Sequence, residues 1–149
     1  MLIIIYNILY YIYNRMMNLK LSSKNLISVA CLTGFVGDAS LQVLSKFMGG
    51  PTGWGLIPYF KQHGSVEALF IAGGMMTIFY VIYLDFLKLP PVWYYLAIYG
   101  IILDYIFRIT MLFPSLKGYY KHLNYFWSGF WGAAPMIIPL FIVKLTQYL

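Results

Sequence analysis

The amino-acid sequence predicts an all-α polytopic membrane protein, a bundle of four transmembrane helices, and its composition already points to this fold class. Hydrophobic residues make up 62% of the 149 residues and charged residues only 9%, whereas a soluble domain has about 25% charged residues. Aromatic residues make up 20% of the chain, which excludes intrinsic disorder. Cys31 is the single cysteine, which excludes a disulfide scaffold.

Four apolar segments are each long enough for a helix that crosses the hydrocarbon layer, which takes about 20 residues. They cover about residues 26–47, 66–87, 92–112 and 125–143. The first follows polar residues 22–25, and Ser65 and Glu67 suit the first turn of the second. Pro114 stops the third and Lys144 follows the fourth. No segment alternates like a barrel strand, so a helical bundle is predicted.

The connections between these segments differ in kind. Residues 49–55 contain four glycines and one proline, which predicts a turn-rich loop. The link at residues 89–91 is short, so the second and third segments form an antiparallel hairpin. Residues 116–122 form a short amphipathic piece whose tyrosines suit the membrane interface.

The chain divides into an N-terminal segment, residues 1–24, and a four-span bundle, residues 25–149. The first 13 residues are apolar but too short to span a bilayer. Two interpretations stay open for them. They form an interfacial helix, or they are a translated upstream extension with the true start at Met16 or Met17.

The basic residues give the chain a net charge of +6 and lie mostly at the ends of the apolar segments. These are Arg15, Lys20, Lys24, Lys46, Lys61, Lys88, Lys117, Lys121 and Lys144. This distribution is typical of side chains that reach lipid headgroups. A lipid bilayer is therefore the expected partner, and no nucleic acid is. Both chain ends are expected on one side of the membrane, the cytoplasmic side.

Two of the predicted spans carry small and polar residues at steps of four, along one helix face. They are Ala30, Gly34, Asp38 and Gln42 in the first span, and Gly100, Asp104 and Arg108 in the third. Small residues let helices approach closely. These two spans cross the membrane in the same direction, which places both acids at similar depth. We expect spans one and three to pack together and Asp38, Gln42, Asp104 and Arg108 to form one buried polar cluster.

Three interpretations of this cluster remain open. In the first, Asp104 and Arg108 pair within their own helix, and Gln42 or a hydroxyl group satisfies Asp38. In the second, the cluster fixes the register of the bundle. In the third, two acids against one arginine leave a negative charge that a proton or cation neutralises, as a transport pathway would need.

No catalytic motif and no metal-ligand set appears in the sequence. His63 and His122 fall in predicted loops on one side of the membrane, but two histidines without a third ligand do not make a zinc site. Neither an enzyme nor a cofactor is therefore expected.

Residues 37–42, Gly-Asp-Ala-Ser-Leu-Gln, resemble the Gly-Asp-x-x-x-Gln signature in the first helix of a family of small four-helix peroxisomal and mitochondrial membrane proteins. Chain length and number of spans also fit that family. Its later motif with tryptophan and proline, before the last helices, has no counterpart in this chain.

Three further blocks, residues 49–55, 112–120 and 124–132, resemble small uncharacterised multi-span membrane proteins of large nucleocytoplasmic DNA viruses. The resemblance extends over about residues 33–142. It implies a membrane component of a virion, in the internal bilayer beneath the capsid or in a host intracellular membrane. It implies no catalytic residues.

The sequence thus favours a structural or assembly role, through helix packing and loop contacts with other virion or membrane proteins or with further copies of this chain. The expected contact surface joins the first loop, residues 49–64, to residues 117–122. Its aromatic and basic residues, which suit protein or headgroup contacts, are Trp54, Tyr59, Lys61, Lys117, Tyr119, Tyr120 and Lys121. The alternative is a small channel or ion-coupled transporter that uses Asp38, Asp104 and Arg108.

Overall fold

The computed structural model describes residues 21–48, 61 and 64–148, and 87% of these are helical, with no strand among them. The predicted all-helical character is confirmed. The elements are α2 (Ser23–Met48), α4 (Ser65–Val81) with its π-helical extension η2 (Ile82–Phe86), α5 (Trp93–Thr110), the short 3-10 helix η3 (Pro114–Leu116), α6 (Lys117–His122) and α7 (Tyr125–Tyr148). Residues 1–20 of the predicted N-terminal segment and most of the first loop lie outside the described residues, and α2 begins within the last two residues of that segment.

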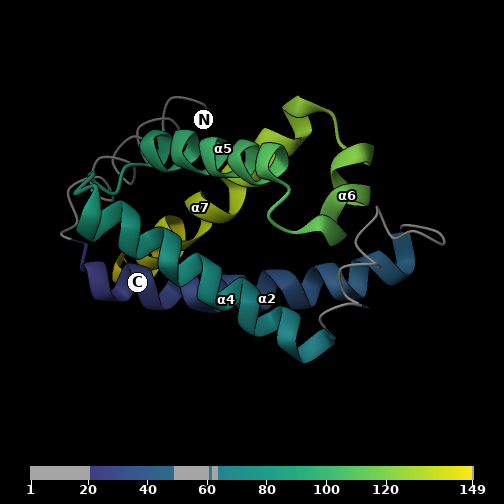
Figure 1. The fold of residues 1–149 in the computed structure, drawn as a ribbon. Coiled ribbons are helices and arrows are strands. Elements are labelled where there is room, and N and C mark those ends of the chain that lie inside the picture. The colour runs from purple at the N-terminus through teal and green to yellow at the C-terminus, as the bar shows by residue number, and fades with distance from the viewer. Residues whose placement is uncertain (1–20, 49–60, 62–63, 149) are drawn as a thin grey trace, which may run out of the picture.

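The helices form two pairs that run roughly along one common direction (Figure 1). α2 packs against α4, α5 packs against α7, and α7 also crosses to contact α2. α6 lies at one end of the bundle, the end at which α4 and α7 begin, and we call this the α6 end. The opposite end holds residues 87–92, the link between η2 and α5, and we call it the hairpin end.

Glycines set the distance within each helix pair. A Cβ atom on Gly34 of α2 would lie 2.8 Å from the carbonyl carbon of Ala72 in α4. A Cβ atom on Gly132 of α7 would lie 2.7 Å from the backbone oxygen of Gly100 in α5. Both distances are shorter than real Cβ contacts, so only glycine permits these approaches. The expectation that spans one and three pack together is wrong, because the small residues of α2 face α4 and those of α5 face α7.

The buried apolar core lies toward the hairpin end. Its residues are Leu26, Ala30, Met76, Tyr80, Tyr83, Leu96, Met136, Leu140 and Val143. Three tyrosine hydroxyl groups at this end donate to backbone oxygens on other segments: Tyr80 to Met136, Tyr83 to Pro90 at 2.7 Å and Tyr99 to Phe79 at 3.2 Å. These bonds let bulky rings fill the core while their polar tips remain satisfied.

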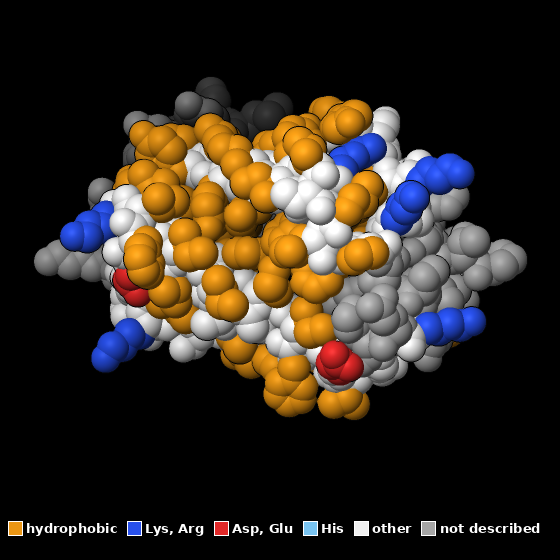
Figure 2. Space-filling model, viewed as in Figure 1, with side chains coloured by type: hydrophobic (Ala, Val, Ile, Leu, Met, Phe, Trp, Pro, Cys, Tyr) orange, Lys and Arg blue, Asp and Glu red, His pale blue; other side chains and the backbone are white. Residues whose placement is uncertain are grey.

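The outer surface of the bundle is apolar along its middle. Figure 2 shows a hydrophobic face over the centre of the molecule, with lysine, arginine and acidic side chains gathered at the two ends. A soluble monomer rarely exposes an apolar patch larger than a few hundred Å². This distribution fits helices that face hydrocarbon and carry their charges to the headgroups.

Three helices are long and apolar enough to cross a membrane: Ser23–Leu44, Ser65–Phe86 and Tyr125–Gln147. Only 22%, 22% and 33% of the residues in their most apolar stretches are buried within the protein. The third predicted span does form a helix, α5, but it does not meet the same criterion. Asp104, Arg108 and four tyrosines lower its mean hydropathy. Among the described residues, length and composition therefore give three candidate spans, not the four predicted.

Replacement of Gly132 by alanine tests the close contact between α5 and α7. The added Cβ would lie 2.6 Å from the Cβ of Asp104, so Gly132→Ala should lower the free energy of unfolding by about 1–3 kcal/mol, as overpacking does. Thermal unfolding in detergent, followed by circular dichroism, measures the change.

Gly74→Ala is the matched control, because no atom lies within 4 Å of a Cβ built on this helical glycine. It should be neutral or raise stability by a few tenths of a kcal/mol, since alanine favours helix over glycine. Equal effects of the two substitutions would contradict the proposed helix pairing.

Candidate functional site

Asp38 is joined to its own helix and to α4. Its side chain is 7% exposed, and its Oδ2 accepts a hydrogen bond of 2.7 Å from Nε2 of Gln42. The same amide nitrogen donates to the backbone oxygen of Ser65, at 2.8 Å. Because Ser65 is the first residue of α4, the pair ties the second half of α2 to the start of α4. Asp38 itself lies ten residues before the end of α2.

Asp104 lies between α5 and α7. The hydroxyl group of Ser128, a fully buried residue in the first turn of α7, donates a short hydrogen bond to Oδ2 of Asp104. The glycine contact at Gly132 brings the two helices close enough for this bond. Asp104 therefore lies six residues before the end of α5, against a different neighbour from that of Asp38.

Arg108 fastens α6 to α5. Its Nη2 donates to the backbone oxygens of Tyr120 and Leu123, at 3.2 and 3.1 Å. These oxygens belong to the end of α6, where carbonyl groups have no partner within the helix. The guanidinium carbon also lies 3.9 Å from the ring centre of Tyr125, within the range of a cation–π contact. Nη1 is buried and makes no hydrogen bond, so the side chain is enclosed rather than open to solvent.

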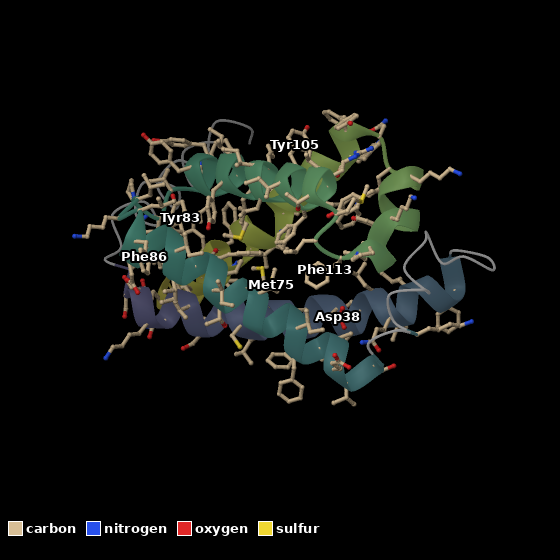
Figure 3. All side chains as sticks on the ribbon, viewed as in Figure 1. Asp38, Met75, Tyr83, Phe86, Tyr105 and Phe113 are labelled. Atoms are coloured by element: carbon tan, nitrogen blue, oxygen red, sulfur yellow. The ribbon has the colours of Figure 1, made fainter. Side chains whose placement is uncertain are left out.

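The expected single cluster is divided into two. In Figure 3, Asp38 lies on α2 in the lower layer, and Tyr105, the residue after Asp104, lies on α5 in the upper layer. Within the part of the chain that the structure describes, Asp38 makes no hydrogen bond or ion pair to Asp104 or Arg108. Gln42 joins Asp38, as one interpretation expected, whereas Asp104 bonds to Ser128 rather than pairing with Arg108.

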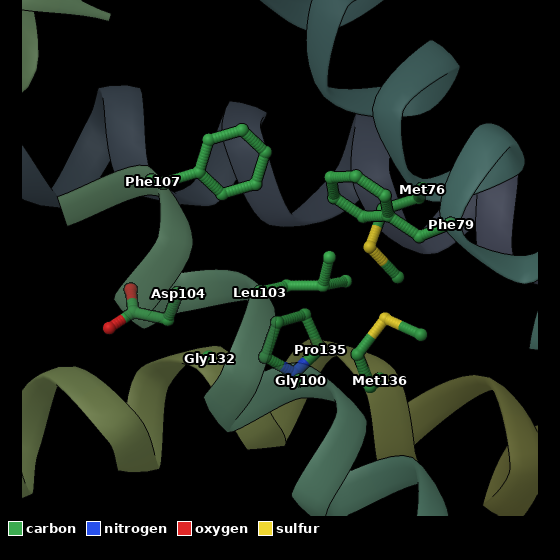
Figure 4. A pocket seen from close by; sticks show the side chains of 9 residues that line it. All are labelled: Met76, Phe79, Gly100, Leu103, Asp104, Phe107, Gly132, Pro135 and Met136. Atoms are coloured by element: carbon green, nitrogen blue, oxygen red, sulfur yellow. The ribbon is translucent and has the colours of Figure 1, made fainter. Parts of the chain in front are cut away.

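The space beside Asp104 is apolar. A small cavity of about 110 Å³ lies among α4, α5 and α7 and is lined mainly by methionine, phenylalanine, leucine and glycine. In Figure 4 the side chains of Met76 and Met136 point toward one another inside it, while the carboxyl group of Asp104 lies at its edge. A cavity with such walls stays dry.

A larger groove separates α2 from α7 toward the α6 end. Its volume is about 570 Å³. It is walled by Thr33, Gly37, Leu41 and Leu44 of α2 and by Trp131, Ala134 and Ile138 of α7. Tyr119 of α6 and Leu123 close it at the α6 end. This groove could not be predicted from the sequence, because it depends on how α2 and α7 diverge.

The predicted contact residues of α6 have different surroundings. Lys117 and Lys121 are exposed, Tyr119 is half-buried, and Tyr120 is only 7% exposed. Burial, together with the nearby carboxylate of Asp104, raises the pKa of Tyr120 to about 12, although Arg108 acts in the opposite direction. Burial also raises the pKa of Tyr119. The expectation of an exposed contact was wrong for Tyr120, which packs near Arg108, its ring centre 6.0 Å from the guanidinium carbon.

The other predicted contact residues lie in the first loop. Lys61 is exposed, while Trp54 and Tyr59 lie outside the described residues. The functional side chains that the sequence did not single out are Ser128 and Tyr125. Each occupies the first turn of α7, and neither stands in a motif that distinguishes it from its neighbours.

Within the ranges that the structure describes, no three side chains of histidine, cysteine or acid gather where they could hold a metal ion. No protein-family model matches the sequence, and no curated protein or solved structure is significantly similar to it.

Arg108→Gln tests the attachment of α6. The change leaves the oxygens of Tyr120 and Leu123 without their charged donor and should lower the free energy of unfolding by about 1–3 kcal/mol. Hydrogen exchange of the backbone amides at residues 117–123 should accelerate, while those in the middle of α4 keep their rate. Lys121→Gln, at an exposed position of α6, is the control and should change little. Unchanged exchange at residues 117–123 in Arg108→Gln would show that Arg108 does not hold α6.

Proposed function

We propose that this chain is a four-span integral membrane protein with a structural or assembly role, neither catalytic nor ion-conducting. The observation that carries the proposal is that the charged side chains of the helices are bonded within the protein. Asp38, Asp104 and Arg108 are each bonded to groups of the protein itself, while the outer faces of the helices are apolar. Charges that are committed to internal bonds fix helix positions and leave little freedom to bind a passing ion.

The orientation of α5 supports a fourth span despite its lower mean hydropathy. Ile98, Ile102, Ile106 and Ile109 follow one face of α5 and are 49–79% exposed. Asp104 and Arg108 point instead toward α7 and α6. With 18 residues, α5 is about 27 Å long, close to the ~30 Å of the hydrocarbon layer. The polar side chains of α5 would thus be hidden from lipid, and its isoleucine side chains would face the lipid.

The α6 end offers the surface for peripheral contacts. Lys61, Lys117 and Lys121 are exposed there, and such cations attract anionic headgroups or acidic partner proteins. Other membrane proteins and further copies of the chain are the proposed protein partners. The resemblance of three sequence blocks to viral multi-span proteins supports a virion internal membrane or a host intracellular membrane as the location.

A channel or transporter is the less favoured function. It would need a polar path past Asp38 or Asp104, but the cavity beside Asp104 is apolar. The two acids also belong to separate helix contacts instead of one shared site.

Cysteine labelling tests the number of spans. In a Cys31→Ala background, single substitutions Lys24→Cys, Lys61→Cys, Lys88→Cys and Lys121→Cys place reporters at exposed positions of the two ends. With four spans, an impermeant maleimide added to sealed vesicles should label positions 24 and 88 from one side, and positions 61 and 121 from the other. If α5 does not cross, position 121 will instead be labelled together with position 88.

Flux measurements separate the structural role from transport. The reconstituted protein should pass neither protons nor cations across liposomes under a pH gradient. Asp38→Asn should leave flux at this baseline and lower the free energy of unfolding by about 1 kcal/mol, because the bond from Gln42 loses its charged acceptor. Asp85→Asn, at an exposed acid of the hairpin end, is the matched control. Flux in the unmodified protein that Asp38→Asn abolishes would overturn the structural role.

A further inference from the structure

The groove between α2 and α7 has the length of one bilayer leaflet. Along α2 its wall runs from Thr33 to Leu44, a rise of about 16 Å. This is close to half of the ~30 Å hydrocarbon layer. Thr33 lies ten residues after the start of α2, near the middle of the span. The groove therefore extends from the bilayer centre to the α6 end, within a single leaflet.

The walls of the groove suit a flexible apolar chain. Gly37 and Ala134 leave its middle hollow, and leucine and isoleucine side chains line its length. Its volume of about 570 Å³ falls within the ~300–1,000 Å³ of small-molecule sites. Tyr119 and Trp131 line it nearer the α6 end, where rings with a polar tip are favoured at the level of the headgroups.

The closed end of the groove lies under a positively charged surface. Lys117 and Lys121 are exposed on α6, and Tyr119 lies two residues from each of them, about 200° around the helix. The ring of Tyr119 thus faces the groove while the lysines face the headgroup side. Each basic residue near a membrane surface favours an anionic lipid about fivefold.

We propose that this groove binds one acyl chain of an anionic phospholipid, whose phosphate lies beside Lys117 and Lys121. The proposal rests on the membrane-embedded bundle described above. Charge favours a lipid over a second copy of the chain, because a parallel dimer across this groove would bring the lysines of two α6 helices together. A lipid held between α2 and α7 would also fill the large apolar gap between these two helices.

A pair of glycines gives a matched test of the groove. No atom lies within 4 Å of a Cβ built on Gly37 or on Gly74, yet Gly37 lines the groove and Gly74 lies on the exposed face of α4. The full chain is extracted from vesicles of phosphatidylglycerol and phosphatidylcholine with identical acyl chains, and retained lipid is counted by native mass spectrometry. The unmodified protein and Gly74→Leu should each retain one phosphatidylglycerol, and Gly37→Leu should retain about tenfold less. Equal retention by the two variants overturns the proposal.

The lysines test the headgroup. Lys117→Gln with Lys121→Gln should reduce the preference for phosphatidylglycerol over phosphatidylcholine by about fivefold for each lysine. Lys24→Gln with Lys88→Gln, at exposed positions of the hairpin end, should keep the preference. An equal loss in both pairs would show a general surface effect and would overturn a specific headgroup site.

Photo-crosslinking identifies the occupant. A photoreactive phenylalanine in place of Trp131, an aromatic residue of similar size that lines the groove, should capture lipid. Capture of a peptide from residues 1–20, of a second copy, or of nothing overturns the lipid assignment.

The labelling pattern of the four single-cysteine variants distinguishes failure of the lipid site from failure of the proposed membrane-spanning bundle. A chain that shows four spans but retains no lipid refutes only the groove site, whereas a chain that fails to span refutes both.

Discussion

A hydrogen-bonding or charged group among hydrocarbon chains has no water to bind, so its partner must come from the protein. This constraint accounts for the positions of Asp38, Asp104 and Arg108 within the bundle. Asp38 is bonded to Gln42, Asp104 to Ser128, and Arg108 to the end of α6. Each bond reaches an element other than its own helix, directly or through Gln42. The polar groups therefore act as fixed points that determine which helices stand beside one another at the α6 end.

At the hairpin end, uncharged polar groups also find their hydrogen-bond partners within the protein. There tyrosine hydroxyls replace carboxylates and donate to backbone oxygens of facing segments, as Tyr80 does to α7. Glycines act between the two ends: Gly34 brings α2 against α4, and Gly132 brings α7 against α5. Close backbone approach makes the polar bonds geometrically possible, and the bonds in turn compensate for the small apolar area that glycine buries. The close packing of the helices at glycines and the hydrogen bonds between them thus depend on one another.

Much of the helix content could be predicted from the sequence, but the pairing of helices could not. Apolar length and prolines mark where helices begin and end, and Pro114 does open η3 shortly after α5. A face of small residues predicts a close contact, but it does not name the neighbour. The depth of Asp38 and Asp104 followed from their distance along each helix, whereas their separation depends on how each helix is rotated about its axis. That rotation is decided by tertiary contacts such as Gly34 of α2 with Ala72 of α4, and Gly100 of α5 with Gly132 of α7.

α5 shows why an average over residues is a weak guide to membrane insertion in a bundle. Its acid and arginine lower its mean hydropathy, yet both are turned inward, and the face it presents outward is a row of isoleucines. The cost of a polar residue depends on whether it meets lipid or protein. Because α7 supplies Ser128 and α6 supplies two backbone oxygens, the place proposed for α5 in the membrane depends on these neighbours. A helix of this kind is expected to insert as part of the assembled bundle, and the contacts that hold α6 and α7 against it are what make a fourth span physically reasonable.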